Sequence, residues 1–247
     1  MVEQEKYSEI IHLIGARKYL RAAEAIQKLL EKEPKNVGLL LDLGYCYTNA
    51  EKFDKAVETY TNVIKNFPTN ETGYVGLGFA YEHQGMSDEA LKEFETSLKY
   101  APDNALVHFE MGQIYFDQDE YQIAIDCFKK AIQFGGKEND GMALDGIARC
   151  NLSLEKYSEA IENAQKILEV DPSMRINAYN LLAIGYLMTK DYVKAKENCE
   201  AYIKLNPSDT DMKELLEDIN DAIEGEAEKK KKPAEAPAGK KSKPKSK

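Results

Sequence analysis

Hydrophobic positions along the chain recur with the spacing of amphipathic helices that follow one another in pairs. Within each pair, apolar residues at i, i+3, i+4 and i+7 give both segments one buried stripe. The clearest pair lies in residues 71–104, and its landmarks are, in order, Tyr74, Leu77-Gly78, Tyr81, Ala90, Phe94 and Pro102. Residues 37–70 show the same order, with Leu40 at the first position, and residues 105–138 show it from His108 to Phe128 without the final proline. The pattern therefore predicts a series of helical hairpins.

Proline and alanine mark the period of this series. Pro34, Pro68, Pro102, Pro172 and Pro207 are separated by 34, 34, 70 and 35 residues. Ala22, Ala56, Ala90, Ala124, Ala160 and Ala195 are separated by 34, 34, 34, 36 and 35 residues. A single hairpin cannot cover its own apolar face, so each repeat must be stabilised by its neighbours in a stack.

The order of landmarks resembles the consensus of the tetratricopeptide repeat family, with Tyr in place of its Trp. The resemblance covers an array over residues 3–209, and its units are 3–36, 37–70, 71–104, 105–138, 141–174 and 176–209. It implies an all-α fold, a right-handed α-solenoid of six helix-turn-helix repeats. It also implies a non-enzymatic scaffold or adaptor that binds other proteins.

The two ends of the pattern and one internal junction depart from the repeat. Residues 210–224 carry one apolar stripe and an acidic face, which predicts a capping helix over the last repeat. Residues 225–247 are rich in Lys, Pro and Ala and lack large apolar side chains, which predicts a disordered tail. Between the fourth and fifth units, Gly135-Gly136 replaces proline and two residues are added. This junction is expected to be the weakest joint of the stack.

In the family, the first helix of each unit lines a concave groove, mainly through its second, fifth, ninth, twelfth and thirteenth residues. By this resemblance the candidate partner-binding residues are Tyr7, Leu41, Tyr45, Asn49, Val75, Phe79, Glu82, His83, Phe109, Gln113 and Phe116. Their apolar and aromatic character favours a partner segment that is itself apolar or amphipathic. The alternative is that these side chains pack on one another or on the chain's own terminal helix.

Charge is distributed unevenly along the chain. The chain carries a net charge of −10, yet residues 229–247 contain nine lysines and one acid, so the residues before them carry −18. The acidic surface is either an ordinary solvated face or a field that attracts a basic partner. The tail is either a solubilising extension or a weak, non-specific contact for nucleic acid or an anionic surface. A self-associating assembly unit is a further alternative for the whole chain.

Catalytic, cofactor and metal motifs do not appear in the sequence. Four cysteines and three histidines are scattered, so free buried thiols are expected and no cofactor or metal is. Co-chaperones of the family grip terminal carboxylates with Lys, Arg and Asn, but the matching positions hold Tyr7, Ile11, Asp42, Thr72 and Gly76. A carboxylate-clamp chaperone tail is therefore not expected as a partner. With neither a secretory signal nor a membrane-spanning stretch, the expected location is cytoplasmic.

Overall fold

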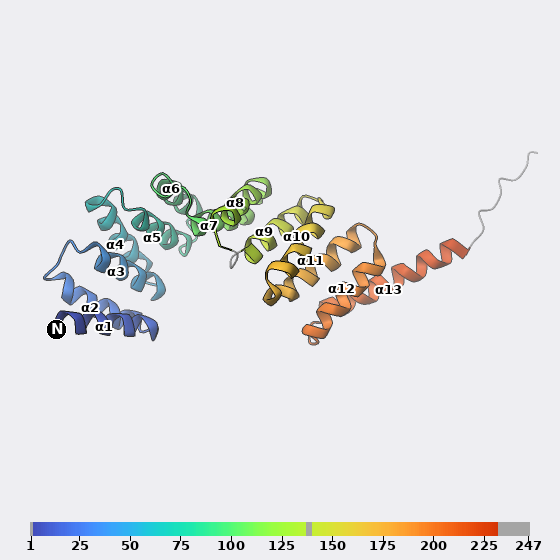
Figure 1. Ribbon diagram of the computed structural model, residues 1–247, viewed down its shortest axis with the longest axis horizontal. Coiled ribbons are helices and arrows are strands. Elements are labelled where there is room, and N and C mark those ends of the chain that lie inside the picture. Colours follow the sequence, from blue (N-terminus) through green and yellow to red (C-terminus); the bar gives the residue numbers. More distant parts are fainter. Residues whose placement is uncertain (1, 137–139, 232–247) are drawn as a thin grey trace, which may run out of the picture. The chain divides into compact units, whose positions relative to one another are not determined.

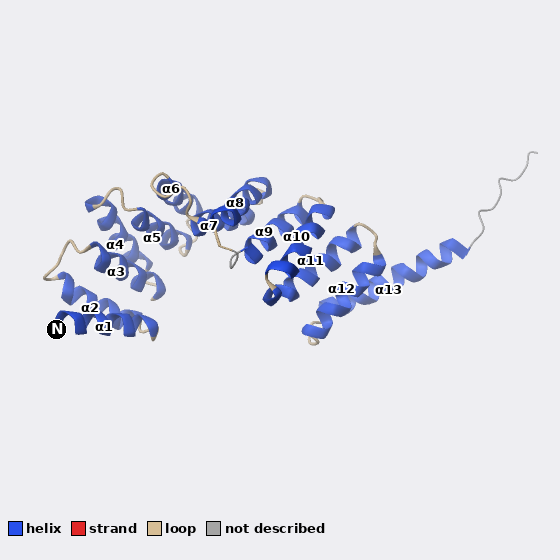
Figure 2. Ribbon diagram, viewed as in Figure 1, coloured by secondary structure: helices blue, strands red, loops and turns tan. Residues whose placement is uncertain are grey.

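A computed structural model describes residues 2–136 and 140–231 of the chain, and within them it contains thirteen α-helices and no strand (Figures 1 and 2). The first helices of the hairpins are α1 (Val2–Gly15), α3 (Val37–Asn49), α5 (Glu71–Glu82), α7 (Ala105–Asp117), α9 (Asp140–Ser153) and α11 (Arg175–Met188). The second helices are α2 (Tyr19–Leu30), α4 (Phe53–Asn66), α6 (Ser87–Leu98), α8 (Tyr121–Phe134), α10 (Tyr157–Val170) and α12 (Tyr192–Leu205). The 3-10 helix η2 (Pro172–Met174) precedes α11, and α13 (Thr210–Lys231) follows the last hairpin. The all-α class and the stacked helical hairpins are thus confirmed.

The chain divides into two compact units, residues 1–154 and 155–247. The boundary falls inside the fifth repeat, after α9, and not at the junction around Gly135 where the sequence suggested a weak joint. The reason lies in the packing of α8 against α9: a Cβ added at Gly146 would lie 2.6 Å from the Phe128 ring. That close approach ties α9 to the repeat before it.

Three hairpins of unit 1, those of α3 with α4, α5 with α6 and α7 with α8, are each closed by one ring that lies on one glycine. Cβ atoms added at Gly44, Gly78 or Gly112 would come within 2.6, 2.5 and 2.7 Å of the rings of Tyr60, Phe94 and Phe128. Real Cβ atoms do not approach other heavy atoms so closely, so these positions require glycine for the helices to reach this distance. The alanines that mark the period, such as Ala90, are fully buried for the same reason.

The entries to α3, α5 and α7 are fixed by asparagine caps. The side chains of Asn36, Asn70 and Asn104 accept hydrogen bonds from the backbone N–H three residues later. Just before two of these caps, a proline carbonyl receives a side chain from the same helix: Tyr74 donates to Pro68 O at 3.0 Å, and His108 Nε2 lies 2.9 Å from Pro102 O. The landmark residues of the repeat therefore hold the turn as well as the core.

The turn between the two helices of each hairpin places one residue in the left-handed region. Gly85 occupies it in the third repeat, with φ of 73°. The other repeats use residues with side chains, at φ between 55° and 62°: Arg17, Glu51, Asp119, Glu155 and Lys190. These positions follow the 34-residue period, so the turn geometry is part of the repeat.

In unit 2, α13 covers the last hairpin. Ile219 and Met212 are buried against a cluster that includes Ala195, Cys199 and Tyr202. The Asp209 side chain caps the helix by accepting from Met212 N at 2.9 Å. The helix continues to Lys231, beyond the expected end at residue 224, because the Glu, Ala and Lys residues that follow Gly225 favour helix. The remainder of the expected tail, residues 232–247, lies outside the described residues.

Candidate functional site

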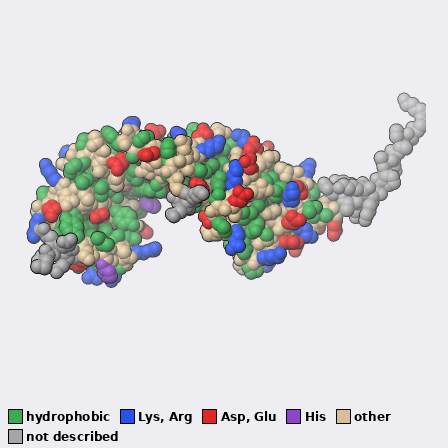
Figure 3. All heavy atoms as spheres, viewed as in Figure 1, with side chains coloured by type: hydrophobic (Ala, Val, Ile, Leu, Met, Phe, Trp, Pro, Cys, Tyr) green, Lys and Arg blue, Asp and Glu red, His purple; other side chains and the backbone are tan. Residues whose placement is uncertain are grey.

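The first helices of unit 1 form its inner side. In Figure 1, α5 and α7 lie toward the inside of the curve of unit 1, while α6 and α8 lie outside it. The space-filling view shows unit 1 hollowed on this inner side, with hydrophobic and acidic side chains at its surface (Figure 3). We call the surface formed by α3, α5 and α7 the inner face.

Two phenylalanines of the inner face lie half-buried against rings of the core. Phe79 meets Phe94 edge to face with ring centroids 5.4 Å apart, and Phe109 lies 5.5 Å from Phe128. Val75 packs against the same cluster as Phe79. These candidate residues therefore serve both the core and the surface, because one side of each ring is held by its own hairpin and the rest remains accessible.

Other candidate residues are more open. Tyr45 is 46% exposed and touches only the edge of Tyr19, at 6.1 Å between centroids, among the ring contacts of the described residues. Asn49 and Gln113 are exposed on the same face. Phe116 is half-buried beside Tyr121, at 5.6 Å. A ligand on this face would meet these side chains without unfolding any helix.

Three candidate residues are engaged within the chain. Tyr7 and Leu41 are half-buried against the first core cluster, and the Tyr7 hydroxyl lies 3.3 Å from Asn36 Nδ2. The exposed His83 stacks on Phe53 of α4, at 5.7 Å between centroids. These three side chains therefore already have contacts within the chain.

Carboxylates accompany the aromatic rings. Burial raises the pKa of Glu110 to about 7, and the charge of Glu82 adds to the increase. Burial also raises the pKa of Glu82, where Asp117 adds to the effect and His83 opposes it. The Glu82 Oε2 atom is buried and has no hydrogen-bond partner among the described residues. Burial likewise raises the pKa of Asp42 on α3.

Sequence reasoning did not identify Glu110 or Asp42 as part of the site. Both occupy the sixth position of their units, which the family pattern does not count among the groove residues. A comparison of the repeats with one another could have identified Glu110. The equivalent positions of the neighbouring repeats hold Gly76 and Gly146. Both glycines lie against rings of the preceding hairpin. Glu110 therefore stands between two repeats that have glycine at this position.

A pocket of about 250 Å³ opens beside Glu110. It is lined by Ala105, Leu106, Phe109, Glu110, Ala131 and Met142. Leu106 and Met142 are exposed apolar side chains, so the walls are apolar and Glu110 is the ionisable group among them. The pocket suits a side chain with an aliphatic or aromatic body.

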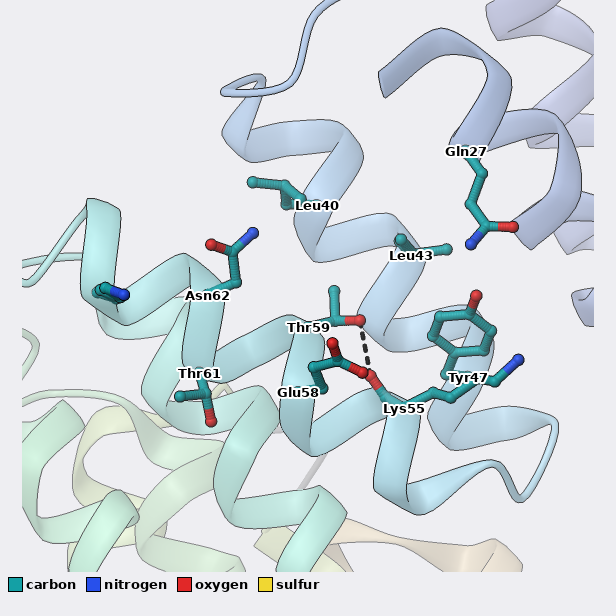
Figure 4. Close-up of a pocket in the computed structure, with 10 residues that line it drawn as sticks. Gln27, Leu40, Leu43, Tyr47, Lys55, Glu58, Thr59, Thr61 and Asn62 are labelled. Atoms are coloured by element: carbon teal, nitrogen blue, oxygen red, sulfur yellow. Dashed lines mark hydrogen bonds between the residues drawn. The ribbon is translucent and has the colours of Figure 1, made fainter. Parts of the chain in front are cut away.

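A larger hollow of about 500 Å³ lies between α2, α3 and α4 (Figure 4). Gln27, Tyr47, Lys55 and Glu58 contribute polar groups to its walls. Lys55 Nζ lies 5.4 Å from the centre of the Tyr47 ring, and the Thr59 hydroxyl donates to Lys55 O at 2.6 Å. Lys55 and Thr59 already have contacts within the chain, so the hollow resembles a solvated surface more than a built site.

Cysteine and histidine side chains do not assemble into a reactive centre. All four cysteines are free and buried, as the sequence predicted. Burial raises the pKa of Cys46 to about 12 and those of Cys150 and Cys199 to about 11. In the part of the chain that the structure describes, no three metal-ligating side chains gather. Nor does any described helix have the length and apolar character to cross a membrane.

The positions that would form a carboxylate clamp hold no cation. Ile11 is exposed, Asp42 is an exposed acid, and Gly76 lies under the ring of Tyr60, where an added Cβ would be 2.2 Å from Cε1. A basic side chain at Gly76 would displace that ring.

Comparisons with known proteins agree with this geometry. Two family models described as tetratricopeptide repeat match residues 13–77, 49–108 and 103–173. Heat shock protein STI1 of Saccharomyces cerevisiae is 30% identical over 105 residues, which are 42% of this chain and 18% of that protein. The Hsp70-Hsp90 organizing protein of Triticum aestivum is 30% identical over 109 residues, 44% of this chain and 18% of that protein. The chain thus spans about a fifth of the length of these relatives.

Solved structures show the same fold. The crystal structure of YrrB, a tetratricopeptide repeat protein with an unusual peptide-binding site, superposes with a TM-score of 0.66 at 20% identity. The match covers 83% of this chain and 99% of YrrB. The family models together extend over more than half of the 247 residues. The chain belongs to the tetratricopeptide repeat family.

Proposed function

We propose that the chain is a non-enzymatic scaffold whose inner face binds an apolar or amphipathic segment of a partner protein. The observation that carries the proposal is the set of rings shared between core and surface on α5 and α7, with the exposed Tyr45 beside them on α3. Tetratricopeptide repeat proteins generally mediate protein–protein interaction. An accessible apolar surface of this kind on a folded protein is typical of an interaction site.

Two features support a binding role over a catalytic one. The thiols are buried with raised pKa values, and thiolates, not thiols, are the nucleophiles of cysteine enzymes. The carboxylates of the inner face lie among aromatic rings, a setting that suits recognition of side chains. Binding in a groove requires only that the inner face be preformed.

The relatives named Hsp70-Hsp90 organizing protein suggest chaperones as partners. The inner face supports a different mode of recognition from a carboxylate clamp, because Asp42 would repel a terminal carboxylate and Gly76 leaves no room for a cation. We therefore propose that a partner binds through an internal amphipathic segment and not through its last residues.

The test uses exposed residues of the inner face, because Phe79 and Phe109 also hold the core. A variant with Tyr45→Ala, Asn49→Ala and Gln113→Ala should lose most of the proteins that co-purify with the full chain, as measured by quantitative mass spectrometry. The control variant carries Tyr100→Ala, Asn66→Ala and Gln133→Ala, all at exposed positions on or next to the outer helices. Equal loss in both variants, or no loss in either, would reject the inner face as the binding surface.

Self-association is a second candidate, and one observation favours it. Ile11 on the first hairpin is an apolar side chain that is 71% exposed. If copies pair through this end, light scattering should show a mass that rises with concentration, and Ile11→Lys should return the chain to a monomer. A strict monomer at all concentrations would remove this candidate.

A further inference from the structure

The inner face has a one-sided charge. Its three helices contain five carboxylates and no lysine or arginine; the acids are Asp42, Glu71, Glu82, Glu110 and Asp117. The outer helices α4, α6 and α8 carry the cations of the same repeats, such as Lys55, Lys92 and Lys130. Positive charge is therefore segregated from the face that holds the exposed and half-buried rings.

Among the described residues, four of the five acids of the inner face form no ion pair, whereas Glu71 accepts a hydrogen bond from the Thr72 hydroxyl at 3.1 Å. The four are Asp42, Glu82, Glu110 and Asp117, and within the same part of the chain Glu82 Oε2 is buried without a hydrogen bond. A carboxylate that is partly removed from water and left unpaired costs free energy. A cation that arrives with a ligand recovers part of that cost, so the face favours a positively charged ligand.

The chain itself supplies one example of such an arrangement. Arg149 of α9 lies with its guanidinium 5.3 Å from the centre of the Phe116 ring and 3.8 Å from the Asp145 carboxylate. An aromatic ring and a carboxylate thus hold one cation at the edge of the inner face. Rings attract cations through their electron-rich faces, and arginine makes this contact most often.

Resting on the proposed function, these observations narrow the class of partner. We infer that the inner face binds a segment in which lysine or arginine residues alternate with apolar ones, with its cations at Glu82 and Glu110. The apolar residues pack on Phe79, Phe109 and Tyr45. The pocket beside Glu110 accepts the aliphatic stem of a lysine or arginine against Leu106 and Met142, while its charged end meets the carboxylate.

The test begins with an unbiased probe. The immobilised full chain is used to select from a phage library of random short peptides, with elution by excess free chain. Enriched peptides should combine Lys or Arg with Leu, Phe or other apolar residues. The selection is repeated on Glu82→Gln with Glu110→Gln, and on a control with Glu89→Gln and Glu95→Gln, which removes the same charge from exposed positions of α6.

Affinity then measures the contribution of the two acids. The most enriched peptide should bind the Glu82→Gln, Glu110→Gln variant about tenfold or more weakly than the control variant, by fluorescence anisotropy. Its affinity should also fall as salt is raised, because the charges are partly exposed. A synthetic peptide with the sequence of residues 229–247, which has the charge without large apolar side chains, should compete poorly.

The other possible outcomes each contradict one part of the proposal. Enriched peptides that are neutral or acidic, or unaffected by the two acid substitutions, overturn the cationic partner and leave the inner face as a binding surface. Competition by the 229–247 peptide at equal strength makes the chain's own tail the occupant. If no enrichment depends on Tyr45, Asn49 or Gln113, the proposed function itself fails.

Discussion

At the residue scale, the distance between the helices of a hairpin depends on one ring and one glycine. Phe94 on Gly78 and Phe128 on Gly112 repeat the contact of Tyr60 on Gly44. In the sequence, Gly44, Gly78 and Gly112 recur at the period of the repeat. The sequence did not predict that Gly76 and Gly146 lie against the rings of Tyr60 and Phe128 from the preceding hairpin. That contact depends on how neighbouring repeats stack.

Gly78→Ala should therefore destabilise the chain by about 1–3 kcal/mol, since the added methyl would overlap the Phe94 ring. Gly15→Ala is the matched control, because nothing lies within 4 Å of its added Cβ. Urea denaturation followed by circular dichroism compares the two midpoints. Equal midpoints would show that the ring moves aside without cost.

Glu110 gives a pH-dependent prediction. Burial raises its pKa from 4.5 to about 7 in the folded state, so the folded chain binds this proton more tightly than the unfolded chain. The carboxylate therefore lowers stability progressively as pH rises from about 4.5 to about 7, and the full cost is present above that range. Glu110→Gln should stabilise the chain above pH 7 by on the order of 1 kcal/mol.

The gain from Glu110→Gln should vanish below the unfolded pKa, where the glutamic acid is neutral in both states. Thermal melting across this range measures the difference, and Glu95→Gln on the exposed side of α6 serves as control. A stabilisation that is the same at every pH would assign the effect to packing and not to the charge.

At the element scale, the hairpin turn is the least obvious part of the repeat. Its left-handed residue falls at Arg17, Glu51, Gly85, Asp119, Glu155 and Lys190. Only one of these is the glycine that a left-handed turn favours, so residue type alone did not reveal the series. The helices were easier to predict because proline, alanine and the apolar stripe mark them in most repeats. The end of α13 was harder to predict, because Glu, Ala and Lys continue a helix as readily as they form a tail.

Two substitutions test this turn, one that removes a glycine at the left-handed position and one that introduces a glycine there. Gly85→Ala should lower the free energy of unfolding by about 1 kcal/mol, since alanine is strained at positive φ. Glu51→Gly should raise it by roughly 0.5 kcal/mol, because the relief of strain exceeds the added entropy of the unfolded chain. Chemical denaturation of both variants measures the two changes in the free energy of unfolding. Shifts of the same sign would mean that side-chain contacts and not backbone conformation control the turn.

At the scale of the whole molecule, the two units predict separate responses to damage. Nearest-neighbour packing limits how far a local loss spreads in a repeat protein. The sequence predicted the stack but not the division after residue 154, because the spacing of Gly135-Gly136 says nothing about the Phe128 contact that crosses it. It also indicated which side the candidate residues face, but not how deeply their neighbours bury Glu82 and Glu110.

Ile219→Ala tests this separation. Ile219 belongs to α13 and its side chain is fully buried, so its truncation should cost about 2–5 kcal/mol. Hydrogen exchange measured by mass spectrometry should show faster exchange in α12 and α13 and unchanged exchange in α5 and α6. Equal acceleration in both units would show that the chain unfolds as one body.

Side-chain footprinting tests the inner face most directly. Tyr45 and Tyr100 have nearly equal exposure, 46% and 47%, but only Tyr45 belongs to the inner face. Hydroxyl-radical oxidation of the full chain should fall several-fold at Tyr45 and Phe109 when a selected peptide binds, while Tyr100 and Phe134 keep their rates. Protection of Tyr100 and Phe134 with no change at Tyr45 would contradict the assignment of the inner face as the partner-binding surface.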